Sequence, residues 1–536
     1  MNKVIKMLLI GLCAVSILVI GSGIGGAAQS RVRGGWSWPT YIDPAVGSDI
    51  SSSTALVSLY DALVYPDIKG NVQPHVAKSW KASADGLTWT FHLRKGVKFH
   101  DGSELTAEDV KFSMDRLTTI GEGFSFLFGK RIVSTEAPDK YTVVFHLKRR
   151  FAPFVRALYM FFIANKDLVL ANIERPGPYG DMGDYGKKYL LTHDAGSGPY
   201  MVKEFLLEEY LLMTQNPSYW EPEYARVNPL APDEVKMYGT MTPVTIRTLM
   251  ANRELEFSDA WQTPETLEAL DKIEGIDIAT YPGGGVYYLM MHTKKPPTDD
   301  VHLRKAVAWA LDYDQLTKFF PGLVQARGPV PQTIPGADPT VFQYHRDLDK
   351  AMEHLKQSKY YGQLDKYPIQ FDWNSDVPVL EKVGLLFMSN VGDIGIEVDL
   401  VKTPWSVVTE KSARIDTSPN INTIWAAGPY PEAGALLDLR YGSAAVATVE
   451  QNEWLLDPEY DEMLQDALST MDEKERFAKY AKIQQYIMDL CPSIFMVEFS
   501  YRQAYQTYID HPAFRGEGPG LYGYSLDPRF MEVHPE

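Results

Sequence analysis

The chain has 536 residues, which is too long for one hydrophobic core, so we expect two or three compact bodies. Apolar residues make up 45% of the chain and charged residues 23%, as in an ordinary globular protein. The formal net charge of −17 disfavours a nucleic-acid-binding protein, because such proteins normally carry a basic balance.

The N-terminus has the features of an export signal. Lys3 and Lys6 precede an apolar run over residues 7–20, and small residues follow as far as Ala28. A basic head, a short apolar core and a small-residue tail are typical of a secretory signal peptide, so we expect cleavage near Ala28. The uncharged stretch is also long enough to span a bilayer, and an uncleaved N-terminal anchor is the alternative.

The first strong pattern after this segment predicts a β-hairpin. Trp89, Phe91 and Leu93 alternate with polar residues, which indicates a strand with one buried face. Asp85-Gly86 precedes this strand and favours a tight turn, so we expect an antiparallel partner over residues 76–81.

A helix and another strand follow the hairpin. Thr106 and Asp109 lie three residues apart, as an N-cap residue and its first-turn acid do, before a periodic apolar segment that ends at Leu117. Residues 141–147 again alternate between apolar and polar side chains, which predicts a second strand. Together these elements suggest a small α/β unit between about residues 65 and 190.

The rest of the chain carries further periodic segments. Apolar periodicity predicts helices over residues 244–255, 303–316 and 476–490, and strands over residues 396–400 and 494–497.

The residue order around the predicted hairpin carries more information than its periodicity. It resembles the signature of the extracellular solute-binding proteins of the dipeptide, oligopeptide and nickel type (bacterial solute-binding family 5), which supply ABC importers. The matching residues are Trp80, Asp85-Gly86, Trp89, Phe91, Leu93-Arg94, Gly96-Val97, Phe99, Asp101-Gly102, Thr106-Ala107 and Asp109-Val110. Later segments resemble the same family in the same order, so the resemblance extends from about Pro39 to Val497.

This resemblance implies a fold and a division of the chain. The implied fold is α/β and two-lobed, a type II periplasmic-binding-protein fold of the large peptide-binding kind with an extra subdomain. The implied segments are residues 1–28 for the signal peptide, residues 31–64, 191–265 and 495–536 for the first lobe, residues 65–190 for its extra subdomain, and residues 266–494 for the second lobe.

No motif indicates bond chemistry. Two G-x-G-x-x-G matches begin at Gly21 and Gly518, but the first lies in the signal segment and the second contains Pro519 with no helix after it. The 11 His have no metal-ligand spacing, and no G-x-S-x-G elbow is present. A hydrolase would need a nucleophile–base or acid–base pair that no pattern reveals. We therefore expect no catalytic residue, no metal and no cofactor.

The candidate ligand-binding segment is residues 423–432. It resembles the cleft-lining segment in which dipeptide binders carry a Trp and an Asp-Pro, whose aspartate receives the amino terminus of the peptide. The Asp-Pro is missing here, and Glu432 is the nearest carboxylate. Trp425 and Tyr430 are candidate stacking surfaces, although each has core packing as an alternative. Further stacking candidates are Trp36, Trp38 and Trp405.

The resemblance implies capture of a solute without chemical conversion. We expect the substrate-binding component of an ABC importer, exported to the periplasm or another extracytoplasmic space. The expected solute is a short peptide, and the alternative solute is an oligosaccharide or glycoside. The alternative function is that of a sensory receptor on the same fold. The expected partners are the solute and the transmembrane subunits of a permease, with no nucleic acid, and the expected state is a monomer.

Overall fold

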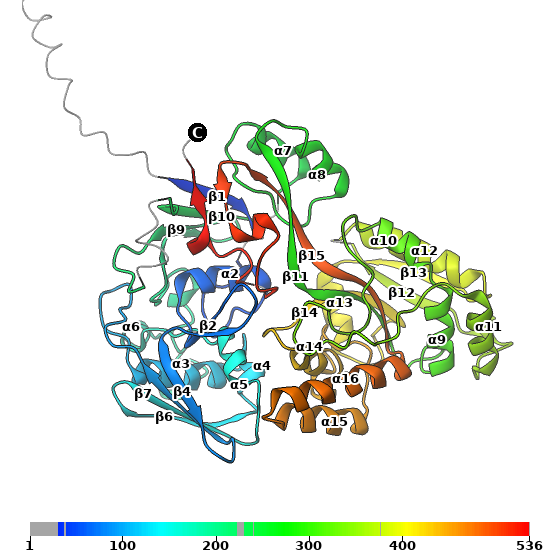
Figure 1. Ribbon diagram of the computed structural model, residues 1–536, viewed down its shortest axis with the longest axis horizontal. Coiled ribbons are helices and arrows are strands. Elements are labelled where there is room, and N and C mark those ends of the chain that lie inside the picture. Colours follow the sequence, from blue (N-terminus) through cyan, green and yellow to red (C-terminus); the bar gives the residue numbers. More distant parts are fainter. Residues whose placement is uncertain are drawn as a thin grey trace, which may run out of the picture.

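The computed structural model describes residues 30–36, 39–221, 230–239, 241–375, 377–521 and 523–534. The predicted signal segment, residues 1–28, lies outside these ranges. Within them, no helix combines the length and the apolar character that crossing a bilayer requires. The described chain forms two lobes connected by a pair of long strands (Figure 1).

The first lobe is built on a four-stranded sheet of order β1-β10-β9-β8. Its strands are β1 (Arg31–Gly35), β8 (Tyr200–Leu206), β9 (Tyr210–Gln215) and β10 (Glu234–Tyr238). The outermost strand β1 pairs with β10 in parallel, and the other neighbours are antiparallel. The helices of this part are α2 (Ile50–Leu59), α7 (Pro243–Ala251) and α8 (Pro264–Leu270).

A second four-stranded sheet, of order β4-β5-β7-β6, lies beside the first-lobe sheet (Figure 1). Its strands are β4 (Ala77–Ala82), β5 (Thr88–Leu93), β6 (Ile132–Asp139) and β7 (Thr142–Leu147). The surrounding elements are the hairpin β2 (Val64–Pro66) and β3 (Val72–Pro74), and the helices α3 (Ala107–Ile120), α4 (Ser125–Phe128), α5 (Phe154–Ala157) and α6 (Lys166–Ala171). The long helix α3 covers the sheet on the side of β6 and β7.

This region confirms the predicted hairpin and capped helix. β4 and β5 pair antiparallel, and Gly86 in the turn has φ +69°, the left-handed region that favours glycine. Thr106 is the N-cap of α3, and its backbone N–H donates to Asp109 Oδ2 at 2.9 Å, which forms one half of a capping box.

The second lobe is built on a five-stranded sheet of order β13-β12-β14-β11-β15. Its strands are β11 (Ile276–Met291), β12 (Ile369–Asn374), β13 (Val398–Thr403), β14 (Ile421–Ala427) and β15 (Ser493–Gln506). Strand β12 pairs in parallel with β13 and β14, whereas β11 is antiparallel to β14 and β15. The helices of this lobe are α9 (Val301–Ala310), α10 (Tyr313–Lys318), α11 (Leu348–Gln357), α12 (Val379–Gly392), α13 (Trp405–Ser412), α14 (Ala433–Tyr441), α15 (Pro458–Ser469) and α16 (Glu473–Leu490).

Short elements complete the chain. The C-terminal segment returns to the first lobe and contains β16 (Ile509–Asp510) and β17 (Glu532–Val533). The 3₁₀ helices are Leu158–Met160, Gly180–Met182, Tyr189–Leu191, Leu364–Lys366, Ser443–Ala445, Pro512–Arg515 and Pro528–Phe530.

Several predicted elements differ in extent from the observed ones. The helix expected over residues 244–255 is α7, which ends at Ala251, and the helix expected over residues 476–490 is α16, which begins at Glu473. The helix expected over residues 303–316 is divided into α9 and α10, because the Asp312 side chain accepts from Gln315 N at 2.9 Å and so caps a new helix. The strand expected over residues 396–400 is β13, which begins two residues later. The strand expected over residues 494–497 is only the first part of β15, which continues to Gln506.

The two lobes are connected by β11 and β15, which we call the connecting ribbon. These strands pair from Ile276 opposite Gln506 to Met290 opposite Ser493, with register shifts near the middle. At the first-lobe end the ribbon packs against α7 and α8 through a small apolar cluster. At one register shift Gly284 has φ +70°, and a Cβ there would lie 1.7 Å from a backbone oxygen of Gly520. Only glycine fits at this position.

Candidate functional site

A cavity of about 400 Å³ lies between the two lobes, beside the connecting ribbon. Its first-lobe side consists of Ser48, Asp49, Ile50, Ser51 and Trp261. Its second-lobe side consists of Tyr287, Asn374, Val377, Leu380, Trp405, Thr423, Ile424, Trp425, Ala426, Ala427, Leu439 and Glu450. This volume is within the range of small-molecule sites, and both lobes contribute to the wall.

Strand β14 provides the centre of the second-lobe wall. Successive side chains of a strand point to opposite faces, so Thr423, Trp425 and Ala427 share one face. Trp425 lies opposite Tyr287 in the register with β11. The pairing of β14 with β12 ends at Asn422, so the cavity residues of β14 lie beyond the paired part of the strand.

Aromatic rings surround Trp425. Its ring centroid lies 4.5 Å from Phe499, 5.9 Å from Trp261 and 6.1 Å from Tyr501. Trp261 comes from the first lobe and is 39% exposed, so its face is accessible at the cavity. These rigid aromatic faces offer apolar area for stacking at low entropic cost.

Three polar atoms of the cavity wall have no hydrogen-bond partner among the described residues. They are Thr423 Oγ1, Trp425 Nε1 and Glu450 Oε2, and all three atoms are buried. Buried donors and acceptors are normally paired, since an unmade hydrogen bond costs about 1–3 kcal/mol. These three atoms belong to residues of the cavity wall but are themselves covered by neighbouring atoms.

The two carboxylates of the wall differ in their surroundings. Asp49 caps α2: its Oδ1 accepts from Ser52 N at 2.9 Å and its Oδ2 accepts from Ser52 Oγ at 2.5 Å. Burial raises the pKa of Glu450, while the nearby Arg440 guanidinium acts in the opposite direction and Glu453 adds to the increase.

The structure brings two of the predicted ligand-binding residues to this cavity, namely Trp425 and Trp405. Trp36 lies beside a neighbouring space of about 50 Å³ that shares Ile50, Ser51 and Trp261 with the larger cavity. Trp38 lies outside the described residues.

Tyr430 and Glu432 do not line the cavity. The Tyr430 side chain is 2% exposed and packs on Phe151, with ring centroids 6.2 Å apart. Glu432 is fully buried: Arg476 donates to it through Nε at 2.8 Å and through the Nη2 nitrogen at 3.0 Å, and Tyr480 donates at 2.8 Å. These hydrogen bonds from second-lobe residues occupy both carboxylate oxygens of Glu432.

Glu432 also takes part in a contact between the lobes, away from the ribbon. Arg156 of α5 donates to Glu432 Oε2 at 2.5 Å, and the backbone N–H of Ala152 donates to Leu468 O at 2.8 Å. Arg131 forms a further ion pair with Asp438. We call this set of contacts between residues 131–156 and residues 430–473 the rim contact; Figure 1 shows α5 next to α16 there.

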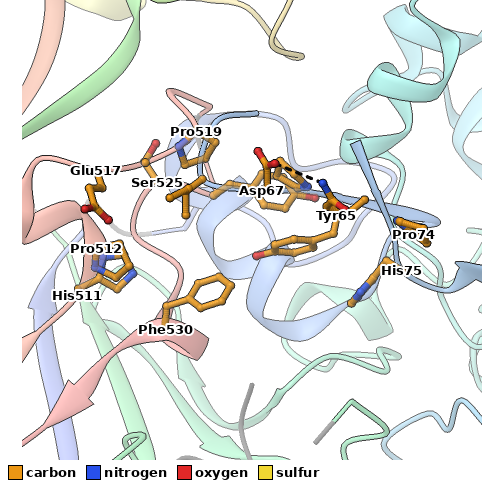
Figure 2. A pocket seen from close by; sticks show the side chains of 15 residues that line it. Tyr65, Asp67, Pro74, His75, His511, Pro512, Glu517, Pro519, Ser525 and Phe530 are labelled. Atoms are coloured by element: carbon orange, nitrogen blue, oxygen red, sulfur yellow. Dashed lines mark hydrogen bonds between the residues drawn. The ribbon is translucent and has the colours of Figure 1, made fainter. Parts of the chain in front are cut away.

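A second cavity, of about 270 Å³, lies within the first lobe between the β2–β3 hairpin and the C-terminal segment (Figure 2). Tyr65 and Phe530 lie across it with ring centroids 6.4 Å apart, and Asp67 at one edge accepts from Gln73 at 3.3 Å. Burial lowers the pKa of His511 in its wall to about 4. None of the described residues predicted for ligand binding lines this cavity, and all of its described lining comes from one lobe.

The sequence pattern missed several cavity residues. Trp261, Tyr287, Phe499 and Glu450 lie in or next to the wall, yet none belongs to a motif. Within the predicted segment, residues 423–432, the cavity wall includes Thr423, Ile424, Ala426 and Ala427 beside Trp425. The strand alternation of β14 was the one signal that could have grouped Thr423 with Trp425 on a single face.

Comparisons with known proteins agree with this architecture. The family model described as "Bacterial extracellular solute-binding proteins, family 5 Middle" matches residues 71–447. The "Probable D,D-dipeptide-binding periplasmic protein DdpA" of Escherichia coli (strain K12) is 29% identical over 484 residues, which cover 87% of this chain and 88% of that protein. The "Dipeptide-binding protein" of the same organism is 25% identical over 519 residues, which cover 91% and 92%.

A solved structure supports the fold. The periplasmic binding protein DppA from Helicobacter pylori, in complex with the peptide STSA, superposes with a TM-score of 0.78 at 22% identity, covering 95% of this chain and 99% of that one. The chain thus has the mixed α/β periplasmic-binding-protein fold over nearly its full length. Since the family match covers most of the chain, the chain belongs to the bacterial extracellular solute-binding proteins of family 5, non-catalytic periplasmic or extracellular proteins that bind small solutes for ABC importers.

Proposed function

We propose that this protein captures a short peptide in the cavity between its lobes and delivers it to a membrane permease. The observation that carries the proposal is the cavity wall, which combines surface from both lobes with the aromatic rings around Trp425. A solute that contacts both lobes gains its full interaction only when they are together, so its binding raises the population of the closed form.

The wall suits a peptide in two respects. Both lobes enclose a space whose volume is within the range of small-molecule sites, and the aromatic rings around Trp425 can pack on apolar side chains of a peptide. The names of the two curated relatives, both dipeptide-binding proteins, favour the same solute class.

The proposal includes a location and a partner. The basic, apolar and small-residue order of residues 1–28 supports export to an extracytoplasmic space, with the uncleaved anchor as the alternative. The transmembrane subunits of an ABC permease are the proposed receiving partner of a monomeric protein. The acidic balance of the chain disfavours nucleic acid.

An oligosaccharide or glycoside is the second candidate solute. The observation that favours it is the group of Trp261, Trp405 and Trp425 in one wall, since sugar rings stack well on flat aromatic faces.

A thermal-shift screen of the purified protein against peptide and sugar panels tests the proposal. A solute present at 100 times its Kd stabilises the folded form by about 2.7 kcal/mol, so its melting temperature rises. We expect di- to tetrapeptides to raise the melting temperature and neutral oligosaccharides to leave it unchanged. Stabilisation by sugars alone would overturn the peptide assignment in favour of the second candidate.

A further inference from the structure

The first-lobe cavity between the β2–β3 hairpin and the C-terminal segment has no part in the proposed function (Figure 2). Its volume of about 270 Å³ exceeds the roughly 150 Å³ of an apolar cavity that holds one benzene molecule. Much of its wall consists of the aromatic rings of Tyr65, Tyr524 and Phe530 together with four prolines. The space is therefore large enough for a small aromatic molecule.

The polar side chains of this wall direct their hydrogen bonds into the protein. The Tyr65 hydroxyl donates to Asp527, and the Tyr524 hydroxyl donates to Tyr159 O at 2.6 Å. Both ring nitrogens of His511 are also occupied: Nε2 lies 3.0 Å from a backbone oxygen and Nδ1 lies 3.0 Å from a backbone nitrogen. A molecule in the cavity would meet mainly the carbon faces of these rings, which favours an apolar occupant.

The charges around the cavity disfavour an anion. Asp67 and Glu517 are carboxylates of the lining, and none of the described lining residues is Lys or Arg. Burial lowers the pKa of His511 to about 4, so its ring is neutral near pH 7, and His75 Nε2 lies 2.8 Å from Asp61 Oδ1. A cation would gain little as well, because Asp67 already accepts hydrogen bonds within the β2–β3 turn and Glu517 is exposed to solvent.

One wall of this cavity also reaches the connecting ribbon and the second lobe. Pro519 lines the cavity, and Gly520, the next residue, packs so closely on Gly284 of the ribbon that a Cβ on Gly284 would lie 1.7 Å from Gly520 O. A Cβ on Gly70, in the β2–β3 turn, would lie 3.1 Å from Pro431 Cβ of the second lobe and 3.6 Å from Pro519 O. The segments that enclose the cavity are thus the ones that touch the moving parts.

We propose that the first-lobe cavity is a second binding site, which takes an uncharged aromatic molecule of about the size of indole, and that the bound molecule restrains the connecting ribbon. A ring that packs on Tyr65 and Phe530 would also hold Pro519 in place. The neighbouring Gly520 then leaves Gly284 less room for backbone rotation. This site is separate from the interlobe cavity and requires no particular solute there.

Isothermal titration of the purified full protein tests the ligand class. The probes are indole, the neutral indole-3-acetamide and the anionic indole-3-acetate. We expect indole and indole-3-acetamide to bind with a Kd below about 1 mM, and indole-3-acetate to bind at least about 10-fold more weakly than the acetamide, because its charge finds no partner in the wall. Absence of indole binding, or equal binding of the acetate and the acetamide, overturns this class of ligand.

Variants locate the binding. Phe530→Ala removes one ring of the wall and should weaken indole binding at least about 10-fold, whereas Phe126→Ala, at an exposed phenylalanine outside the lining, should bind as wild type. Ile68→Trp enlarges a half-exposed lining side chain and should also weaken binding, with Val244→Trp on α7 as its control. Melting curves verify folding. Wild-type affinity in folded Phe530→Ala overturns the site, and Ile68→Trp decides if Phe530→Ala does not fold.

Hydrogen–deuterium exchange with and without indole tests the restraint on the ribbon. We expect slower amide exchange over residues 65–75 and 511–521, which form the site, and over residues 282–286 of β11. Protection of the site without protection of residues 282–286 overturns the restraint. Protection confined to residues 421–427 would place indole in the interlobe cavity and overturn the site. None of these results bears on peptide capture, which the thermal-shift screen tests separately.

Discussion

Removing Arg156 should weaken solute binding although this side chain does not touch the cavity. The Arg156→Ala variant deletes the guanidinium that connects α5 of the first lobe to Glu432 of the second, at 2.5 Å. The Arg156 side chain is 17% exposed and that of Glu432 is fully buried, so the pair is shielded from solvent on one side. The second lobe should remain folded, because Glu432 keeps Arg476 and Tyr480.

The magnitude follows from these surroundings. Leaving a buried charge with no partner costs about 3–5 kcal/mol, and an exposed ion pair contributes about 0.2–1 kcal/mol. Glu432 retains its other donors, so we expect the closed form to lose about 1–3 kcal/mol, which corresponds to about a 5- to 150-fold increase in Kd. The effect arises because the apparent affinity scales with the population of the binding-competent form.

Two measurements check this prediction. Calorimetry gives the Kd for the solute that the screen identifies, and small-angle X-ray scattering gives the radius of gyration with and without it. Arg149→Ala is the matched control, since Arg149 is an exposed arginine nearby that forms no part of the rim contact. A Kd within 2-fold of wild type together with unchanged scattering would refute a role of the rim contact in closure.

Three further predictions concern the cavity, the ribbon and the first lobe. Trp425→Ala should weaken solute binding by about 30-fold or more while the far-UV circular dichroism stays unchanged; unaltered affinity would remove Trp425 from the site. Gly284→Ala should lower the melting temperature by several degrees more than Gly362→Ala, because both glycines have positive φ but only Gly284 has a backbone oxygen in the Cβ position. Burial alone lowers the pKa of His75, but the Asp61 carboxylate at 2.8 Å outweighs it and the pKa is raised. The stability that protonated His75 gains from Asp61 is present below the unfolded pKa of 6.5 and is lost as pH rises through the folded pKa. His75→Asn should therefore lower the free energy of unfolding more at about pH 5.5 than at about pH 9. An equal loss at both pH values would contradict this prediction.

Local elements with strong patterns could be predicted from the sequence. The β4–β5 hairpin and the start of α3 rest on residues within a few positions of each other, such as Gly86 in the turn and Thr106 at the cap. Their geometry depends on backbone sterics and short-range hydrogen bonds, which a sequence displays directly.

The site could be predicted only in part, because its wall joins distant segments. Asp49, Trp261 and Glu450 meet across the two lobes, and this meeting depends on how β11 and β15 pair. Glu432 has the chemistry expected of a ligand carboxylate, yet Arg476, 44 positions away, and Arg156, 276 positions away, take both of its oxygens. No periodicity reveals such pairings.

The connecting ribbon makes reorientation of the halves a simple movement. The two strands that connect the lobes, β11 and β15, are neighbours in one sheet. A change in the twist of this sheet therefore rotates one lobe relative to the other while the core of each lobe stays packed. The barrier to this turning then depends on the stiffness of two strands and on the glycine-bearing irregularity near their middle. Substitutions that stiffen this irregularity should slow the cycle of uptake and release while leaving the energies of its end states nearly unchanged.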